Sequence, residues 1–230
     1  EMIGNIAHQW KQPLSLISMS NGLLKINREV EGFCSEEEVD DAIEKIENGV
    51  EYLSTTIDDF RNFFKANKQT TVFSINEVIE KTIKLTSAQF SARGITIIKD
   101  INPIQIKSYE NELIQVLMNI LNNARDALEN KQYDKFIFIT TEKVEDNLII
   151  KIKDNAGGIP NDIIERVFES YFTTKEDSKG TGIGLYMSQE IITKHMKGML
   201  TVENIEYTYE NQKCTGAEFI IELKVNSKEI

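Results

Sequence analysis

Hydrophobic residues recur at alternating steps of four and three along residues 39–64. The positions are Val39, Ile43, Ile46, Val50, Leu53, Ile57, Phe60 and Phe64. This unbroken spacing predicts a helix that packs in a coiled coil or a helical bundle. Ser35 and the acidic residues that follow it are suited to be the N-cap and first turn of that helix.

The first 30 residues repeat this pattern less strictly. The apolar stripe contains Ile3, Ile6, Trp10, Pro13, Ile17, Ser20 and Leu24. The segment "EVEGFCS" between the two patterns indicates a turn, so residues 1–66 are predicted to form a helical hairpin. Because two long apolar stripes are poorly buried in a single hairpin, we predict a homodimer in which two hairpins make a four-helix bundle.

After residue 70 the hydrophobic pattern becomes that of mixed strands and helices. Strands are predicted at residues 71–74, 95–101, 104–108, 135–144, 147–154, 199–205 and 217–225. Helices are predicted at residues 75–92, at residues 110–130 and after Gly184. The fold class is therefore α+β, with a helical hairpin domain at residues 1–66 and an α/β sandwich at residues 67–230.

The charge of the chain narrows the range of partners. The formal net charge is −11, which disfavours binding to nucleic acid or to an anionic membrane surface. No apolar run approaches the roughly 20 residues of a membrane span, so we expect no direct membrane contact. Cys34 and Cys214 are far apart and are expected to be free thiols of a reducing compartment. The sequence opens in helical register without a cap, so we expect a fragment of a longer protein.

His8 and Pro13 stand out in the first helix. If Ile3 takes position a of a heptad, His8 falls at position f and points away from the seam. Pro13 leaves the carbonyl of Gln9 without its helical partner and favours a kink, where relaxed backbone would let a second domain approach. The alternative is a surface histidine without a chemical role.

Two segments of the second domain carry candidate binding groups. Asn119 and Asn123 are four residues apart on a predicted helix and share a face, and their amide oxygens suit Mg²⁺. Asp154 ends a predicted strand, where its carboxylate can accept a hydrogen bond from the amine of adenine. Gly157 and Gly158 would let the backbone approach the ring. Surface amides and an ordinary turn are the respective alternatives.

A glycine-rich segment precedes the last predicted helix. Gly180, Gly182 and Gly184 leave backbone N–H groups free at a helix start, which favours phosphate. Lys175 and Lys179 can offset the charge of a triphosphate there. Phe168 and Phe172 either dock this mobile lid or belong to the core.

Taken together and in order, these segments resemble the motifs of sensor histidine kinases. "HQWKQPLS" resembles the phosphoacceptor box, "NELIQVLMNILNNARDAL" the N box, "DNAGGIP" the first glycine box, "VFESYFTTK" the F box, "KGTGIGL" the second glycine box and "TGAEFIIEL" the last glycine segment. The resemblance covers nearly the whole chain. It implies a sandwich of the GHKL ATPase type and an enzyme that phosphorylates His8 with ATP and Mg²⁺.

The resemblance also implies a set of nucleotide contacts and partners. The implied contacts are Asn119, Asn123, Asp154, Gly158, Ile159, Phe168, Thr174, Lys175, Lys179, Gly180, Thr181, Gly182, Gly184 and Leu185, with Asn119 and Asn123 also holding the metal. The implied partner is the receiver domain of a response regulator, which accepts the phosphoryl group on an aspartate. This part of the chain is expected in the cytoplasm, within a parent that can be a membrane-bound sensor.

Two other functions stay open. GHKL hydrolases resemble the chain but carry a glutamate where it has Asn119, and a neutral amide cannot take a proton from water. This favours a kinase over an ATPase. Gln9 stands where most of the family has an acidic residue, which favours a dimerising nucleotide-binding module without catalysis.

Three further positions bear on the details. Gln12, four residues after His8, is a candidate for phosphatase activity toward the regulator. Asp126 replaces a lysine often found in the N box and is unfavourable near a triphosphate unless it faces away or pairs with Arg125. His195 is expected to be a helix-end residue near a favourable dipole.

Overall fold

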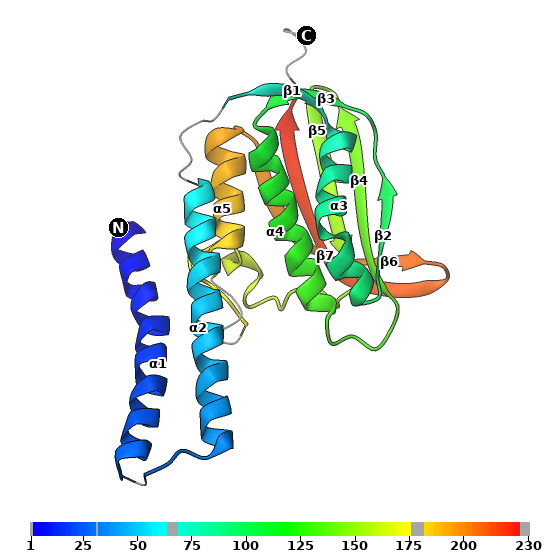
Figure 1. The fold of residues 1–230 in the computed structure, drawn as a ribbon. Helices are drawn as coiled ribbons and strands as arrows, with labels where there is room; N and C mark the ends of the chain where they lie inside the picture. The colour runs from blue at the N-terminus through cyan, green and yellow to red at the C-terminus, as the bar shows by residue number, and fades with distance from the viewer. Residues whose placement is uncertain (1, 31, 64–68, 176–181, 226–230) are drawn as a thin grey trace. The chain divides into compact units, whose positions relative to one another are not determined.

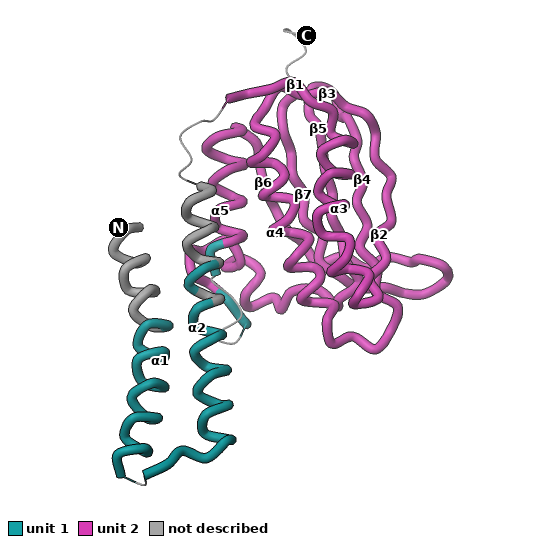
Figure 2. The backbone as a smooth tube through the Cα atoms, viewed as in Figure 1, with its two compact units in different colours: residues 1–65, 173–183 teal, residues 66–172, 184–230 magenta. Residues whose placement is uncertain are grey.

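The computed structural model describes residues 2–30, 32–63, 69–175 and 182–225, and within these the side chains of residues 13–30, 32–50, 53–54, 69–175 and 182–225. The chain divides into two compact units (Figure 2). One comprises residues 1–65 and 173–183, and the other comprises residues 66–172 and 184–230.

The first unit is built on a pair of antiparallel helices, α1 (Met2–Val30) and α2 (Glu36–Phe63), which lie side by side (Figure 1). A capping box starts α2: the backbone N–H of Glu38 donates to Ser35 Oγ at 3.2 Å, and that of Ser35 donates to Glu38 Oε2 at 2.8 Å. The hydrogen bonds that the Ser35 N–H and hydroxyl donate to the Glu38 carboxylate lower its pKa. The predicted cap at Ser35 is confirmed.

Glycine permits a close approach between the two helices. α1 continues through Pro13, which is buried, and Pro13 and Ile17 face Gly49 of α2. A Cβ atom at Gly49 would lie 3.0 Å from Ile17 Cγ1 and 3.5 Å from the Pro13 carbonyl oxygen. A larger residue would therefore push the helices apart at the level of Pro13.

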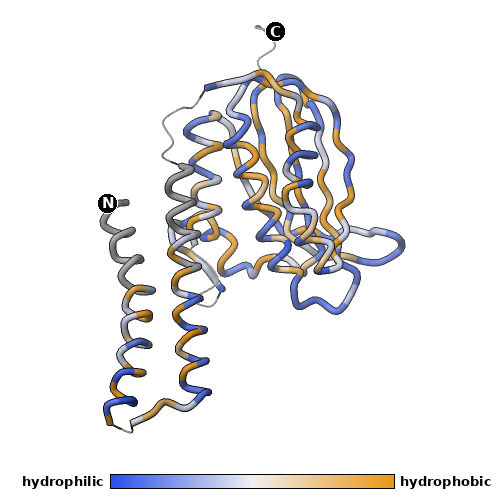
Figure 3. Tube along the Cα trace, in the orientation of Figure 1, coloured by the Kyte–Doolittle hydropathy of each residue, from blue (hydrophilic) through white to orange (hydrophobic). Residues whose placement is uncertain are grey.

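A second apolar stripe on α1 remains uncovered. It contains Leu16, Met19, Leu23, Ile26 and Val30, again at steps of three and four, with exposed fractions of 39%, 64%, 55%, 56% and 78%. Figure 3 shows hydrophobic and hydrophilic segments alternating along both helices. On α2, Ile43 and Val50 are also exposed, whereas Ile46 and Leu53 are half-buried. The hairpin thus has apolar surface left over after its two helices have packed.

The second unit contains a five-stranded sheet in the order β2-β4-β5-β7-β6. Its strands are β2 (Ile95–Asp100), β4 (Lys135–Val144), β5 (Asn147–Asp154), β6 (Met199–Tyr209) and β7 (Gln212–Lys224). β2 and β4 are parallel, and the other pairs are antiparallel. β1 (Thr71–Ser74) and β3 (Gln105–Ser108) form a separate two-stranded sheet, which the sequence patterns did not predict.

Three helices cover one face of this sheet: α3 (Ile75–Ala92), α4 (Glu110–Leu128) and α5 (Gly184–Glu190) (Figure 1). Alternate residues of β5 are buried, as expected for a strand with one covered face. α5 continues as a π-helix over Ile191–His195, and a 3₁₀ turn spans Ile164–Arg166. The predicted α+β architecture and sandwich are confirmed.

The β6–β7 hairpin extends beyond its predicted ends. Tyr207 and Tyr209 of β6 meet Phe136 and Phe138 of β4 edge to face, with ring centroids 4.9–5.5 Å apart. Lys153 lies over the Tyr207 ring at 4.2 Å. Residues 206–216, between the two predicted strands, are mostly polar. The hydrophobic pattern therefore did not predict these strand ends.

Two further findings concern the described residues. Cys34 and Cys214 are free, as predicted. None of the described helices combines the length and the hydrophobicity required to cross a membrane.

Candidate active site

Asn119 joins the middle of α4 to the start of α5. Its Nδ2 donates to the Gly184 carbonyl oxygen and to Ser188 Oγ, both at 3.1 Å. Among the described residues no hydrogen bond reaches Asn119 Oδ1, so this oxygen is available as a ligand. Asn123 lies one turn further along α4 and is half-buried. The two amides therefore share one face of α4, at the start of the helix that follows the glycine-rich segment.

Asp154 lies at the end of β5 and is almost fully buried, with 4% of its surface exposed. Its Oδ1 accepts hydrogen bonds from the N–H groups of Ala156 at 2.8 Å and Ala217 at 3.3 Å. Burial raises the pKa of the carboxyl, while these bonds and the charge of Lys131 lower it. No described residue donates to Oδ2, which leaves a buried acceptor without a protein partner.

The chain turns sharply after Asp154. Gly157 and Gly158 have φ angles of +99° and +82°, a backbone region that residues other than glycine rarely adopt. The Gly157 N–H donates to the Thr215 carbonyl oxygen at 2.9 Å. A Cβ atom at Gly158 would lie 2.6 Å from Asn204 Oδ1. Both positions therefore require glycine, for conformation and, at Gly158, for space.

The β6–β7 hairpin packs against the residue at which this turn begins. The Tyr207 hydroxyl donates to the Asp154 carbonyl oxygen at 3.0 Å, and burial raises the pKa of Tyr207. A Cβ atom at Gly216 would lie 1.7 Å from the same carbonyl oxygen. Glycine at position 216 is therefore a condition for the close packing of β7 against the end of β5.

Lys131, which lies outside the candidate residues predicted from the sequence, places a positive charge beside this turn. A Cβ atom at Gly157 would lie 3.7 Å from Lys131 Nζ, and the charge of Lys131 acts on Asp154. Tyr133, in the same loop, donates its hydroxyl to the Asn155 carbonyl oxygen at 2.8 Å. The loop after α4 thus borders the glycine turn with one positive charge and one aromatic ring.

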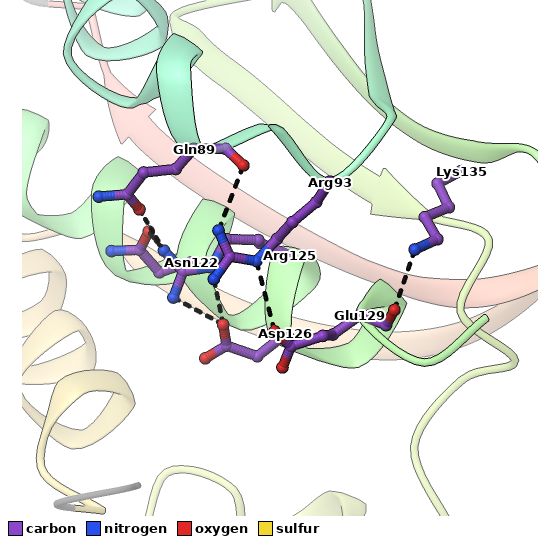
Figure 4. A network of polar contacts seen from close by, with 7 residues as sticks. All are labelled: Gln89, Arg93, Asn122, Arg125, Asp126, Glu129 and Lys135. Carbon is purple, nitrogen blue, oxygen red and sulfur yellow. Dashed lines mark hydrogen bonds and ion pairs between the residues drawn. The ribbon is translucent and has the colours of Figure 1, made fainter. Parts of the chain in front are cut away.

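Asp126 belongs to a network of polar contacts at the C-terminal ends of α3 and α4 (Figure 4). Asp126 Oδ1 lies 2.6 Å from a terminal nitrogen of Arg125, whose guanidinium also donates to Asn122 Oδ1 at 3.0 Å and to Gln89. Arg93 pairs with Glu129 in the same network. Of the two arrangements that would make Asp126 tolerable near a triphosphate, the structure shows the pairing with Arg125.

Comparison with known protein families decides the identity of this arrangement. Residues 108–227, more than half of the chain, match the family described as "Histidine kinase-, DNA gyrase B-, and HSP90-like ATPase". Residues 1–69 match the "His Kinase A (phospho-acceptor) domain". The chain belongs to the sensor histidine kinases.

Individual relatives agree with this assignment. Sporulation kinase E of Bacillus subtilis is 32% identical over 67% of this chain, and the two-component sensor PprA of Pseudomonas aeruginosa is 28% identical over 97% of it. The chain spans only 20% and 24% of the length of these curated relatives. Among solved structures, the histidine kinase ThkA in complex with the response regulator TrrA has the same fold. The match covers the whole of this chain and 63% of the ThkA chain, with a TM-score of 0.72 at 22% sequence identity.

The second unit of this sensor histidine kinase contains eight of the implied nucleotide contacts. These are Asn119, Asn123, Asp154, Gly158, Ile159, Phe168, Gly184 and Leu185. The Phe168 ring meets the buried Phe219 of β7 edge to face at 6.4 Å. This contact favours the core role for Phe168 over docking of a lid. Phe172 lies under the Arg166 guanidinium at 4.4 Å.

The remaining implied residues lie elsewhere. Thr174, Lys175 and Gly182 belong to the first unit, and Gly182 has a φ angle of +62°. Lys179, Gly180 and Thr181 lie outside the described residues. His8, Gln9 and Gln12 fall within α1, but their side chains also lie outside the described part of the chain.

His195 ends the π-helix, as its predicted place at a helix end requires. Its Nδ1 lies 3.0 Å from Glu112 Oε2, and its ring meets Tyr109 edge to face at 6.5 Å. These contacts join the end of the π-helix to the first turn of α4. They describe a structural role, consistent with the expectation that His195 takes no part in the chemistry.

Proposed function

We propose that the chain is the core of an ATP-dependent protein-histidine kinase, which phosphorylates His8 and passes the phosphoryl group to an aspartate of a response regulator. The observation that carries the proposal is the presence, on one chain, of a phospho-acceptor domain and an ATPase-type domain with Asn119 where a hydrolase needs a base. An amide cannot deprotonate water at neutral pH. The γ-phosphoryl group of ATP therefore requires another acceptor, and His8 is the candidate.

Asp154 and the glycine turn supply the adenine end of the proposed ATP site. The buried Oδ2 of Asp154 needs a hydrogen-bond donor, because an unpaired buried acceptor is destabilising. The exocyclic amine of adenine is such a donor. Gly157 and Gly158 have no side chains of their own beside it, so backbone is left for a flat ring to approach.

Asn119 and Asn123 supply the phosphate end. Asn119 is oriented by its two bonds to Gly184 and Ser188, with Oδ1 left available. Among the described residues there is no group of three or more His, Cys, Asp or Glu side chains that could hold a metal. Mg²⁺ would therefore bind through the two amide oxygens together with phosphate oxygens and water, and it would neutralise charge on the triphosphate.

In the proposed transfer, a ring nitrogen of His8 attacks the γ-phosphorus atom. The bond from this atom to the bridging oxygen breaks, and ADP leaves with the electron pair. The imidazole is a competent nucleophile because its ordinary pKa, about 6.5, leaves it mostly neutral at pH 7. The contribution of the protein is mainly positioning and charge neutralisation.

The exposed stripe on α1 supports the proposed homodimer. Five apolar residues at heptad spacing remain uncovered after α1 has packed against α2. A second hairpin would bury them in a four-helix bundle. The receiver domain of the regulator is proposed to dock on the hairpin near His8. The histidine kinase ThkA, which has the same fold, has been solved in complex with a response regulator, which supports a partner of this class. Gln12 is proposed to assist removal of the phosphoryl group from that regulator.

Labelling with γ-³²P ATP tests the proposal. The wild-type protein should acquire label that is stable to base and labile to acid, as phosphohistidine is. His8→Ala should lose this label and retain ATP binding, whereas His195→Gln, which changes the only other histidine, should keep it. Release of phosphate from ATP by His8→Ala would instead identify a hydrolase. Absence of ATP binding in the wild-type protein would refute both readings.

A further inference from the structure

Asn204 of β6 forms a two-way hydrogen-bonded pair with the backbone of Ile159. The Ile159 N–H donates to Asn204 Oδ1 at 2.7 Å, and Asn204 Nδ2 donates to the Ile159 carbonyl oxygen at 2.6 Å. Nδ2 also lies 3.5 Å from Asn161 Oδ1. A side-chain amide thus pairs with the backbone N–H and C=O of a residue 45 positions away, as a residue of a neighbouring strand would, although Ile159 is not in a strand.

The same side chain presses against the glycine turn. Asn204 Oδ1 occupies the space that a Cβ atom at Gly158 would need, at 2.6 Å from its ideal position. Asn204 therefore holds the peptide group after Gly158 in place. It also fills the space beside Gly158, which leaves no room for a Cβ atom there. Its neighbour Glu203 points to the opposite face of β6, because side chains alternate along a strand.

The rest of the turn is fixed at other points by different groups. The Gly157 N–H is bonded to the Thr215 carbonyl oxygen, and Asp154 is held by Ala156, Ala217 and Tyr207. These contacts end at Gly157. Among the described residues, the hydrogen bonds to the Ile159 backbone come from the Asn204 side chain alone. The segment that leaves the turn therefore depends on one amide.

We propose that Asn204 is a positioning residue that shapes the adenine end of the ATP site by holding Ile159 and Gly158 in place. The inference rests on the proposed ATP site, and it adds a residue outside every motif of the sequence. Asn204 does not itself reach the reacting atoms. Its loss should weaken nucleotide binding and leave the phosphoryl transfer step unchanged once ATP is bound.

The test compares Asn204→Ala with the wild-type protein and with Glu203→Ala, a change of the adjacent exposed residue. ADP affinity is measured by calorimetric titration, and the initial rate of autophosphorylation is measured against ATP concentration. Two lost hydrogen bonds should raise the Kd for ADP and the KM for ATP about tenfold, with kcat within about twofold of wild type. Glu203→Ala should leave all three values unchanged.

A second variant separates positioning from folding. Asn204→Asp keeps an acceptor for the Ile159 N–H but replaces the Nδ2 donor with an oxygen that faces the Ile159 carbonyl oxygen. It should raise the KM at least as much as Asn204→Ala at pH 7. Thermal unfolding without nucleotide identifies a change in stability, and a merely structural role would lower kcat with the folded fraction and leave the KM of the folded molecules unchanged.

The outcomes distinguish this inference from the proposed function. Wild-type protein that binds no ADP would refute the ATP site itself. Wild-type protein that binds ADP, together with an unchanged KM in both Asn204 variants, would overturn the role of Asn204 alone. Gly158→Ala provides a further check, because it should reduce affinity by a larger factor in the wild-type protein than in Asn204→Ala, where the colliding amide is gone. Equal factors would contradict the contact.

Discussion

The helical hairpin and the sandwich unit differ in how completely each buries its own apolar side chains. In the sandwich, the large apolar residues of α4 and the central strands are almost fully buried, including Leu113, Ile120 and Ile150. In α1, by contrast, Met19, Leu23 and Ile26 are each more than half exposed. Exposed apolar side chains in an ordered stripe indicate an interface. The sandwich can therefore fold on its own contacts, whereas we propose that the hairpin is completed by a second copy.

The difference also separates two uses of glycine. Gly216, in the sandwich, is enclosed by backbone at the end of β5, whereas no atom lies within 4 Å of a Cβ atom added at Gly22 of α1. One position is demanded by packing in a closed core. The other lies on a helix in which this face has no neighbour among the described residues.

The largest expected effect follows from this contrast. Gly216→Ala places a methyl group 1.7 Å from the Asp154 carbonyl oxygen, and neither backbone can move freely. We expect it to lower the free energy of unfolding by more than about 3 kcal/mol, as measured by urea denaturation. Gly22→Ala is the control, and it should raise the stability of α1 by up to about 1 kcal/mol. Similar effects of the two changes would remove the distinction.

Disruption of the hairpin stripe is the next largest effect. Met19→Asp combined with Leu23→Asp places two charges in the proposed interface, and each lost side chain contributes about 1.5–3 kcal/mol to burial. We expect the dimer dissociation constant, measured by sedimentation equilibrium, to rise at least about 100-fold. The Kd for ADP should not change. Lys25→Ala, at an exposed position off the stripe, should leave the dimer intact. A dimer that survives the double change would show that another surface joins the copies.

Asp154→Asn tests the link between stability and binding inside the sandwich. Burial raises the pKa of Asp154, so the folded state holds its proton at higher pH than the unfolded state does. The free energy of unfolding should therefore fall as the pH rises from the unfolded pKa of about 3.9 through the raised folded pKa, and then level off. Asp154→Asn removes this loss.

Asp154→Asn should thus be more stable than wild type at pH 7 without nucleotide and should approach wild type near pH 4, in urea unfolding measured across this range. It should also bind ADP at least about tenfold more weakly, because the proposed acceptor for the adenine amine is lost. If the free energy of unfolding of the wild-type protein and that of Asp154→Asn depended on pH in the same way, this account would be contradicted.

The smallest expected effect concerns the network in Figure 4. Arg125 and Asp126 are largely buried, with 18% and 26% of their side chains exposed, whereas Arg93 and Glu129 are 37% and 54% exposed. Arg125→Gln should lower the free energy of unfolding by about 1 kcal/mol, and Arg93→Gln by less than about 0.5 kcal/mol. Chemical denaturation of both variants measures the difference. A larger loss from Arg93→Gln would show that burial does not rank these contacts.

Residue patterns predicted the regular elements well where burial is one-sided. The helix α3 and the strands β4 and β5 have the predicted bounds. The apolar residues of α3 and β5 follow the 3.6-residue or two-residue period of an element with one covered face, whereas β4 was indicated by its continuous apolar run. The ends of β6 and β7 were missed because polar residues there are held by aromatic contacts with β4. Such contacts depend on residues about 70 positions away and leave no local signal.

Residues of the candidate site could be predicted from the sequence only where they belong to a motif. Asp154, Gly158 and the two asparagines belong to segments that resemble known boxes. Gly216 also belongs to such a segment, but its steric reason is visible only from the neighbouring strand. Asn204 belongs to none, because one exposed asparagine in a strand has no distinguishing pattern. On α1 the sequence indicated the stripe that faces α2, and the second stripe was identified only when exposure was known.

The attachment of the glycine turn to β6 and β7 has a consequence for the order of events during synthesis. Residues 157–159 leave the ribosome well before residues 204–215, which supply the long-range hydrogen bonds that hold them within the described part of the chain. A nascent chain that stops short of β7 therefore has the nucleotide-binding segments without the means to arrange them. Competence to bind nucleotide should arise late in translation, after the helical hairpin and the helices of the sandwich have already emerged from the ribosome.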